Sequence, residues 1–283
     1  MVWQRVWMLI LLALPMISVG EEATLRIVSY NIRHARGMDD VVDPERIAAV
    51  VRGLRPDVVC LQEVDKDQPR SGHIDLTQVL ADLLEMEGVF GPNYYFNDGE
   101  YGNATLSRYP ILEHDNLALP NPDNVEPRGA LRTVIEVEGI PVEIWNTHWG
   151  LRPHERAEQS SAMLERMADD KSVLVVGDLN EQVGATGVDA LLGPLRDTWN
   201  PEAGIGTVPV GTPRRRIDYI LASPQIGVLE HRIIHDEATM IASDHLPVLA
   251  VLTIPRPSAE KDDDPAGRAL FEVQENPESP DES

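Results

Sequence analysis

The chain is poor in cysteine and in aromatic side chains. Its single cysteine, Cys60, excludes an internal disulfide, and the apolar residues around it indicate a small buried side chain. Stability must therefore come from a packed core. Aromatic residues make up 5% of the chain and only three are Phe, so no aromatic or apolar hairpin suited to a lipid surface is evident.

Positive charge is also scarce. The chain has 24 Lys and Arg against 47 Asp and Glu, which gives a formal net charge of −23 at pH 7. A protein with this balance repels a polyphosphate such as DNA unless a local basic groove or bound cations compensate. The charge therefore favours a small molecule or a lipid head group over nucleic acid as a partner.

A long hydrophobic run occurs once, from Val6 to Val19. Arg5 precedes it and the small residues Ser18 and Gly20 stand at its end, a pattern typical of a secretory signal cleaved after Gly20. No cysteine follows the run, which argues against a lipoprotein anchor. We therefore expect residues 1–20 to be a signal peptide, the mature protein to be periplasmic or secreted, and no transmembrane segment to remain after cleavage.

The C-terminal segment has a different composition from the rest. Residues 256–283 hold nine acidic and three basic side chains, with several prolines and few aromatics, which is typical of a disordered tail. The intervening residues 21–255 suit one large domain. Because candidate site residues are spread over this whole length, we expect a single catalytic domain. We also expect the protein to be a monomer.

Hydrophobic periodicity predicts alternating strands and helices, followed by a series of short strands. Helices are predicted at 44–54, 75–84 and 155–167, and strands at 25–30, 57–61, 104–106, 130–137, 142–146, 172–176, 217–221, 227–234 and 246–254. This order is typical of an α/β protein in which helices cover the sheet.

Polar side chains stand at the ends of the predicted strands. They are Asn31, Glu63, His148, Asp178, Asn180, Asp218, Asp244 and His245. Loops at one edge of a layered sheet converge, so these residues can meet although they are far apart in sequence. The run Ser243-Asp244-His245 by itself suggests a serine hydrolase triad, but neighbours along a strand point to opposite faces, which makes that interpretation poor.

The oxygen atoms in this set favour one chemistry. Asn, Asp and Glu oxygens suit a hard cation such as Mg²⁺ or Mn²⁺, and the absence of a cysteine cluster argues against structural zinc. A hard cation beside two histidines and a carboxylate can support in-line attack of water on a phosphodiester, without a covalent intermediate.

Seven ordered motifs resemble those of the endonuclease/exonuclease/phosphatase superfamily over residues 25–254. They are Tyr30-Asn31-Ile32, Leu61-Gln62-Glu63-Val64, Gly102-Asn103-Ala104, Asn146-Thr147-His148, Gly177-Asp178-Leu179-Asn180, Ile217-Asp218-Tyr219 and Ser243-Asp244-His245-Leu246-Pro247. Two further segments, 128–131 and 150–156, most resemble the bacterial metal-dependent hydrolase branch. The resemblance implies a four-layer α/β sandwich, in which two mixed, mainly antiparallel β-sheets pack face to face and are flanked by helices.

The resemblance also implies roles for individual residues. Glu63 is similar to the family's main metal ligand, with Asn31 and Asp244 completing an Mg²⁺ or Mn²⁺ site. The implied catalytic residues are Asp178, which orients or deprotonates the attacking water, Asn180 at the phosphate, His148 at a phosphate oxygen or the leaving group, and Asp218, which orients His245. Family members differ over whether the Asp or a His is the base. The implied substrate-binding residues are Asn103, Arg128 and Arg33, and other branches place an acidic metal-binding residue after the first motif, where this chain has Arg33-His34.

Two motif neighbours have alternative interpretations. Asn103-Ala104-Thr105 matches a glycosylation acceptor, but we interpret Asn103 as a site residue. Trp149 could stack on a substrate or pack in the core.

The sequence thus predicts an exported, metal-dependent hydrolase of phosphoester bonds, specifically a phosphodiesterase. The rival functions are a secreted endonuclease or exonuclease, a sphingomyelinase-like lipid phosphodiesterase, and a binding module that has lost its activity. The joint presence of the catalytic and metal-binding residues argues against the inactive module.

Overall fold

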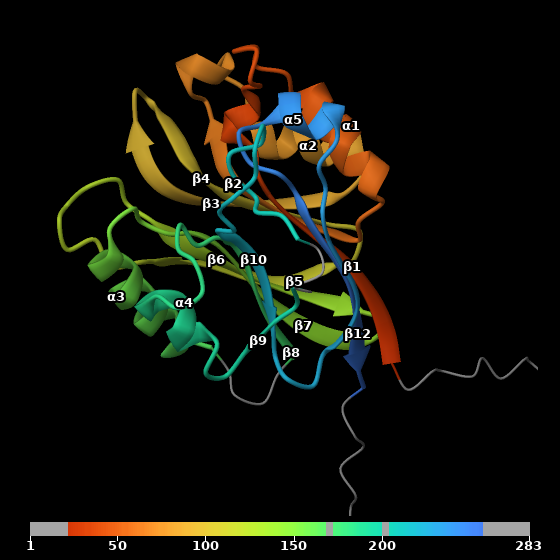
Figure 1. Cartoon of the computed structure of the whole chain (residues 1–283). Helices are drawn as coiled ribbons and strands as arrows, with labels where there is room; N and C mark the ends of the chain where they lie inside the picture. Colours follow the sequence, from red (N-terminus) through yellow and green to blue (C-terminus); the bar gives the residue numbers. More distant parts are fainter. Residues whose placement is uncertain (1–21, 168–171, 200–203, 257–283) are drawn as a thin grey trace, which may run out of the picture.

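The computed structural model describes residues 22–167, 172–199 and 204–256. The predicted signal peptide and, apart from Arg256, the predicted acidic tail lie outside the described residues. Two six-stranded sheets pack face to face with helices on their outer faces, so that the domain has four layers (Figure 1). The predicted fold class is therefore confirmed. No helix in the described ranges is both long and apolar enough to cross a membrane.

The first sheet contains both ends of the described domain. Its strands are β1 (Glu22–Asn31), β2 (Val58–Lys66), β3 (Glu87–Phe96), β4 (Gly99–Ser107), β11 (Gly227–Ile233) and β12 (Val248–Pro255). Their order in the sheet is β11-β12-β1-β2-β4-β3. β1 and β2 pair in parallel, and the other neighbours pair antiparallel.

The second sheet is built from the middle of the chain. Its strands are β5 (Ile111–Ala118), β6 (Gly129–Val137), β7 (Ile140–His148), β8 (Ser172–Asp178), β9 (Arg196–Asp197) and β10 (Asp218–Ala222), in the order β5-β6-β7-β8-β10-β9. β7 and β8 pair in parallel, whereas the other neighbours are antiparallel. All nine predicted strands and three predicted helices are present across the two sheets and their covering layers.

Helices cover the outer face of each sheet. On the first sheet lie α1 (Pro44–Leu54), α2 (Leu76–Leu84) and α5 (Glu237–Ala242), and on the second lie α3 (Pro153–Leu164) and α4 (Thr186–Leu191) (Figure 1). The carboxylate of Asp43 caps α1 by accepting a hydrogen bond from the backbone N–H of Arg46. Asp75 caps α2 in the same way. Two short 3₁₀ turns, η1 (Arg33–Ala35) and η2 (Pro69–Ser71), follow β1 and β2.

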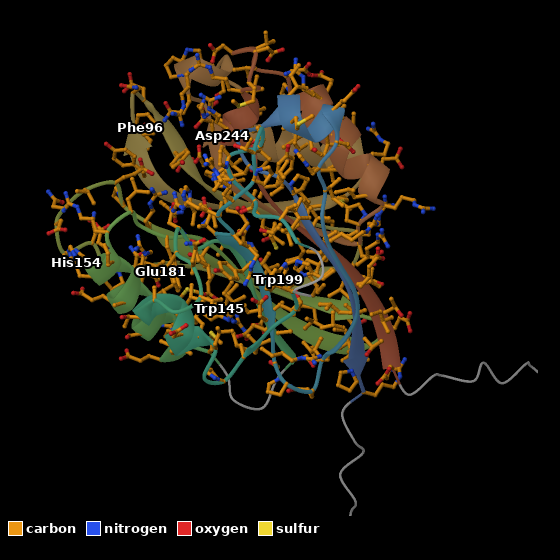
Figure 2. The ribbon with its side chains drawn as sticks, in the orientation of Figure 1. Phe96, Trp145, His154, Glu181, Trp199 and Asp244 are labelled. Carbon is orange, nitrogen blue, oxygen red and sulfur yellow. The ribbon has the colours of Figure 1, made fainter. Side chains whose placement is uncertain are left out.

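The strand pattern divides the core into three apolar layers. Along β1, Leu25 and Ile27 point between the sheets, whereas Val28 and Tyr30 pack against the helices of the first sheet. Cys60 is buried between the sheets, as predicted. On the outer face of the second sheet, Trp145 is buried beneath α3 and α4 (Figure 2). Burial of this apolar surface is the main source of stability in a chain without disulfides.

Candidate active site

The candidate site forms where the apolar layer between the sheets ends. The strand face that carries Ile27 in β1 continues, four residues later, to the amide of Asn31, and both residues are buried. Three neighbouring strands of the second sheet bring acidic and imidazole groups to the same edge. Asp178 is paired in register with His148 on one side and with Asp218 on the other. The predicted convergence of strand ends thus occurs for these four residues.

Gly177 allows β7 and β8 to approach closely beside Asp178. Its φ of +143° lies in a region that favours glycine, and an added Cβ would lie 1.9 Å from the carbonyl oxygen of Thr147. Any larger residue would push β8 away from β7. The glycine therefore keeps Asp178 next to His148.

Asp178 is held by donors on both carboxylate oxygens. The side-chain amide of Asn31 donates to Oδ2 at 3.1 Å, and the backbone N–H of Asn180 donates to Oδ1 at 2.9 Å. The Nε2 atoms of His148 and His245 lie 3.4 and 3.6 Å from the same Oδ2. Burial, together with the nearby Asp218 carboxylate, raises the pKa of Asp178 to about 7. The side chain is therefore fixed in position and poised to exchange a proton near neutral pH.

Asn180 follows Asp178 in a left-handed backbone conformation, with φ of 51°. Its side-chain amide donates to the carbonyl oxygen of Trp149 at 2.9 Å. Asn180 lines the site cavity, and its backbone N–H holds Asp178. The turn thus connects the two loops that follow β7 and β8.

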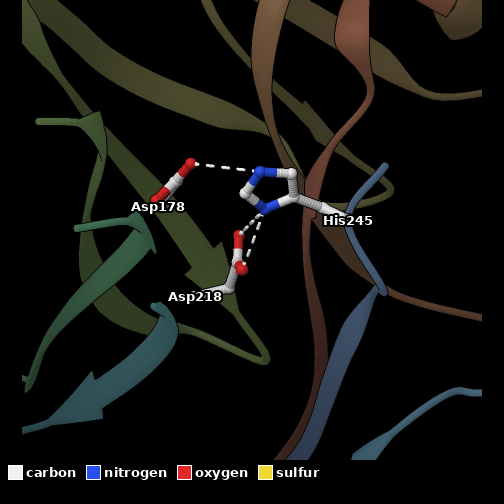
Figure 3. Close-up of side chains that lie close together, drawn as sticks. All are labelled: Asp178, Asp218 and His245. Atoms are coloured by element: carbon white, nitrogen blue, oxygen red, sulfur yellow. Dashed lines mark hydrogen bonds and ion pairs between the residues drawn. The ribbon is translucent and has the colours of Figure 1, made fainter. Parts of the chain in front are cut away.

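His245 is paired with Asp218, as the sequence predicts. Its Nδ1 lies 3.1 and 3.0 Å from the two oxygens of Asp218, and its Nε2 faces Asp178 (Figure 3). Burial alone would lower the pKa of His245, but the carboxylates of Asp218 and Asp178 outweigh it and raise the pKa to about 10. His245 is thus an imidazolium at neutral pH, and its Nε2–H points into the site.

His148 differs from His245 in being neutral. Nη1 of Arg128 lies 3.0 Å from its Nδ1, and a guanidinium has no acceptor, so Nδ1 must accept and the ring proton must sit on Nε2. Burial lowers the pKa of His148 well below its usual range, and the charges of Arg128 and His245 lower it further. His148 is therefore a neutral donor, oriented by Arg128 towards the oxygen of Asp178 that His245 also faces.

Glu63 reaches the site through a β-bulge. The pairing of β2 with β4 shifts register between Leu61 and Val64, and Glu63 has a left-handed φ of 58°. Bulges of this kind re-aim a side chain, and here Glu63 lines the cavity and accepts a hydrogen bond of 3.0 Å from Asn31. Burial raises the pKa of Glu63, and the carboxylate of Asp244 raises it further.

Asp244 and Arg33 lie together beside Asn31. The Nε of Arg33 is 3.8 Å from Oδ2 of Asp244, and the backbone N–H of Arg33 donates to the side-chain oxygen of Asn31 at 3.1 Å. The guanidinium of Arg33 thus faces one of the predicted metal ligands. Arg33 is not among the residues that line the cavity. Its role in substrate binding stays a prediction.

Asn103 is buried on β4, between the two sheets. Its exposed fraction is 1%, and its side-chain amide donates to the carbonyl oxygen of Gly129 on β6 at 3.1 Å. An attached glycan is incompatible with this burial, so the glycosylation alternative is wrong. Trp149 is fully buried with its indole N–H 3.4 Å from the sulfur of Met163, which makes it a core residue rather than a stacking platform.

A buried amide pair that the sequence does not predict joins the two sheets behind the site. Gln62 donates to the side-chain oxygen of Asn146 at 2.8 Å, and Asn146 donates to the carbonyl oxygens of Leu61 and Ala104. Gln62 directly precedes Glu63, and Asn146 lies two residues before His148 on the same strand. Their place within the motifs was the available signal, but the cross-sheet contact depends on packing that no single motif reveals.

The site opens into a cavity of about 370 Å³. Glu63, His148, Asp178, Asn180 and His245 lie along it, and Arg128 contributes to its wall. Asp178, Asp218 and His245 each offer a ligand atom within 4.8 Å of the others, so this trio could hold a metal ion. Buried carboxyl groups with raised pKa values are groups that a divalent cation would stabilise in their ionised form. The buried carboxyl groups of Glu63 and Asp178 therefore fit a metal centre.

The fold and this site belong to a known family. The model of the Endonuclease/Exonuclease/phosphatase family matches residues 28–245, and the chain is a member of that family. Its sequence relatives include YbhP of Escherichia coli (strain K12), which is 34% identical over 146 residues, corresponding to 46% of this chain and 56% of YbhP. The chain thus spans just over half the length of that relative.

Solved structures of the same fold extend the similarity. A family member from Beutenbergia cavernae DSM 12333 is 28% identical with a TM-score of 0.74, covering 82% of this chain and 72% of that one. A mannosyl-6-phosphatase from Bacteroides thetaiotaomicron VPI-5482 is 22% identical with a TM-score of 0.67, covering 81% of this chain and 100% of that one. The second similarity is one of fold alone.

Proposed function

We propose that the protein is a metal-dependent phosphodiesterase in which Asp178 orients and deprotonates an attacking water. One observation carries the proposal: donors fix both oxygens of Asp178, and the Nε2 atoms of His148 and His245 face the same oxygen. A carboxylate held in this way beside a cavity can act as a general base. Membership of a family of phosphoester hydrolases supports the same chemistry.

The proposed metal ligands are Glu63, Asn31 and Asp244, with Mg²⁺ or Mn²⁺ as the cation. Glu63 and Asn31 are already in contact, and the raised pKa of Glu63 is partly due to the charge of Asp244 nearby. The trio of Asp178, Asp218 and His245 is less suited, because Nδ1 of His245 is engaged by Asp218. When bound, the cation would neutralise charge on the phosphoryl oxygens of the substrate.

The protein's own residues would accept the proton of the water and hydrogen-bond the phosphate. Asp178 would take a proton from the water as the water oxygen bonds to phosphorus. The bond from phosphorus to the ester oxygen would break, and the leaving oxygen would depart as a phenolate or take a proton from solvent. The imidazolium of His245 would donate a hydrogen bond from Nε2 to a non-bridging phosphoryl oxygen. His148, as a neutral donor, hydrogen-bonds a second oxygen on the phosphate, and its ring is held by Arg128. These charged and neutral donors stabilise the charge that develops on the phosphate in the transition state.

We propose a diester rather than a monoester as the substrate. Cationic side chains (Arg70, Arg128 and His245) and carboxylates (Glu63, Glu126 and Asp178) both line the cavity, so the comparison of a diester with a monoester below is the test of this choice. The nuclease alternative is weakened by the net charge of −23 and by the burial of Trp149. The inactive module is disfavoured because Asp178, the proposed base, has both His148 and His245 within 3.4 and 3.6 Å of its Oδ2.

Turnover of a simple diester tests the proposal. We expect the protein to hydrolyse bis-p-nitrophenyl phosphate with Mg²⁺ or Mn²⁺, to be inactive after chelation, and to act more weakly on p-nitrophenyl phosphate. Glu63→Gln should raise the metal concentration for half-maximal activity by about tenfold or more, the range seen when metal-site residues are changed. Gln78→Glu, a change of similar size on the exposed face of α2, serves as the control. Absence of cleavage with every metal would overturn the proposal.

We further propose that the enzyme works outside the cytoplasm, which rests on the sequence of residues 1–20. The protein isolated from its host should begin at Glu21. N-terminal sequencing of periplasmic and secreted fractions measures this directly, and a chain that retains Met1 in those fractions, or that is found only in the cytoplasm, would contradict export.

A further inference from the structure

One wall of the cavity is a rigid assembly around Arg70. Nε and Nη2 of Arg70 donate to the two oxygens of Asp65 at 2.8 and 2.7 Å, and the Asp65 side chain is fully buried. The guanidinium carbon lies 5.3 Å from the ring centroids of both Phe96 and Tyr101. Arg70, Phe96 and Tyr101 all line the cavity, and Phe96 sits on the β3–β4 hairpin (Figure 2).

The turn that carries Arg70 is anchored to the same hairpin. The side-chain amide of Gln68 donates to the carbonyl oxygen of Phe96 at 2.8 Å, and Gly99 packs so closely on the backbone of Asp67 that a Cβ would lie 2.8 Å from it. The cation on this wall is therefore held in one orientation before any ligand arrives. Such preorganisation reduces the entropic cost of binding.

The aromatic rings of the wall leave no open face for stacking. Tyr94 stacks on Phe96 with ring centroids 4.7 Å apart, Arg70 lies over Phe96 and Tyr101, and Tyr101 is only 8% exposed. A nucleobase needs a free ring face, and a quaternary ammonium group needs ring faces without a competing cation. The wall is thus unsuited to a base or to a choline-like head group.

The wall also provides no net positive charge for a second phosphate. Asp65 neutralises Arg70, while Glu63 and Glu126 line the same cavity. What remains is a set of hydrogen-bonding groups: Nη1 of Arg70, which the pair with Asp65 does not use, and the Tyr101 hydroxyl. Burial raises the pKa of Tyr101 well above its ordinary value, and Glu63 and Glu126 raise it further, so the phenol stays protonated.

We propose that this wall is a subsite for a hydroxyl-rich ring on the substrate, a cyclic polyol or sugar esterified to the scissile phosphate. Arg70 Nη1 and the Tyr101 hydroxyl hydrogen-bond the ring hydroxyls, and the carboxylate of Glu126, which pairs with Arg128 and also lines the cavity, serves as an acceptor. The cavity of about 370 Å³ lies at the small end of ligand pockets, which suits a phosphate with one compact ring. The inference rests on the proposed phosphodiesterase function.

The kcat/KM values of three diesters distinguish the candidate substrate classes. Glycerophosphoinositol carries a cyclic polyol, glycerophosphocholine carries a quaternary ammonium group of comparable size, and bis-p-nitrophenyl phosphate carries neither. With the preferred metal, kcat/KM for glycerophosphoinositol should exceed that for glycerophosphocholine by about tenfold or more, the effect of two hydrogen bonds of ordinary strength.

Tyr101→Phe removes only the hydroxyl and keeps the ring that packs on Arg70. The ratio of KM for glycerophosphoinositol to KM for bis-p-nitrophenyl phosphate should rise about fivefold, since one hydrogen bond to the ring is lost. Arg70→Lys, which keeps a cation beside Asp65 but loses the planar fork, should raise the same ratio. Tyr95→Phe is the matched control, because Tyr95 lies on the same hairpin and is 69% exposed, and it should change neither KM.

The outcomes distinguish this inference from the proposed function. If bis-p-nitrophenyl phosphate is cleaved but glycerophosphocholine is the better natural diester, or Tyr101→Phe leaves the KM ratio at its wild-type value, the polyol subsite is overturned and the phosphodiesterase stands. If no diester is cleaved with any metal, both fail. A ratio that rises in the Tyr101 and Arg70 variants and not in Tyr95→Phe supports the subsite, because a purely structural role would affect all three esters alike.

Discussion

Asp178→Asn should lower the turnover of bis-p-nitrophenyl phosphate by about 10³-fold, within the range that a positioned general base contributes. The four groups facing the Asp178 carboxylate are all donors, from Asn31, Asn180, His148 and His245. An amide at this position loses the basic oxygen and presents an N–H to at least one of those donors. The loss should therefore appear in kcat measured at saturating metal and substrate.

The metal dependence of Asp178→Asn separates a base from a ligand. If Asp178 acts as the base, excess Mn²⁺ leaves the deficit in place, whereas a lost metal ligand would be offset by raising the Mn²⁺ concentration. Asp82→Asn, an exposed change on α2, should match wild type. Wild-type turnover in Asp178→Asn would remove Asp178 from the mechanism and the proposed reaction with it.

The elements that the sequence predicted are those with strong periodicity or continuous burial. The helix predicted at 44–54 coincides with α1, whose larger apolar residues, Ile47, Val50, Val51 and Leu54, are buried. The strands that the sequence does not predict, β3, β5 and the two-residue β9, all lie at an edge of a sheet. β3 contains Gly88, Gly91 and Pro92, and β5 is mostly exposed, so neither shows the alternation on which strand prediction depends.

For the site too, features that depend on one strand can be predicted from the sequence, whereas features that depend on packing cannot. The position of a polar residue at the end of a strand is a property of that one strand, so the sequence could predict that Asn31, His148 and Asp178 lie at one edge of the sheets. The contacts of Arg128 with His148 and of Arg70 with Asp65 come from loops whose positions depend on the assembled sheets. The bulge that re-aims Glu63 is likewise a matter of register between β2 and β4. The sequence therefore predicts which groups gather, while protonation and tautomer follow from their packing.

His245→Ala should reduce turnover by at least about 100-fold, the usual scale for a positioned acid or transition-state donor. The geometry gives the reason. Asp218 holds Nδ1 and keeps the ring charged, so the substitution removes the cationic donor that faces the reacting phosphate and leaves Asp178 and Asp218 in mutual repulsion. Steady-state kcat with bis-p-nitrophenyl phosphate measures the effect, with thermal unfolding as a check on folding.

Asp218→Asn tests whether the charge on His245 matters as well as its position. The amide can still accept a hydrogen bond from Nδ1, but it no longer stabilises the imidazolium, so the pKa of His245 should fall towards its ordinary value. Turnover should then drop in the same direction as in His245→Ala but by a smaller factor. A loss below about tenfold in His245→Ala would exclude His245 from the mechanism. If Asp218→Asn matched wild type, the His245 ring would act through its position alone, and Asp218 would serve only to hold it.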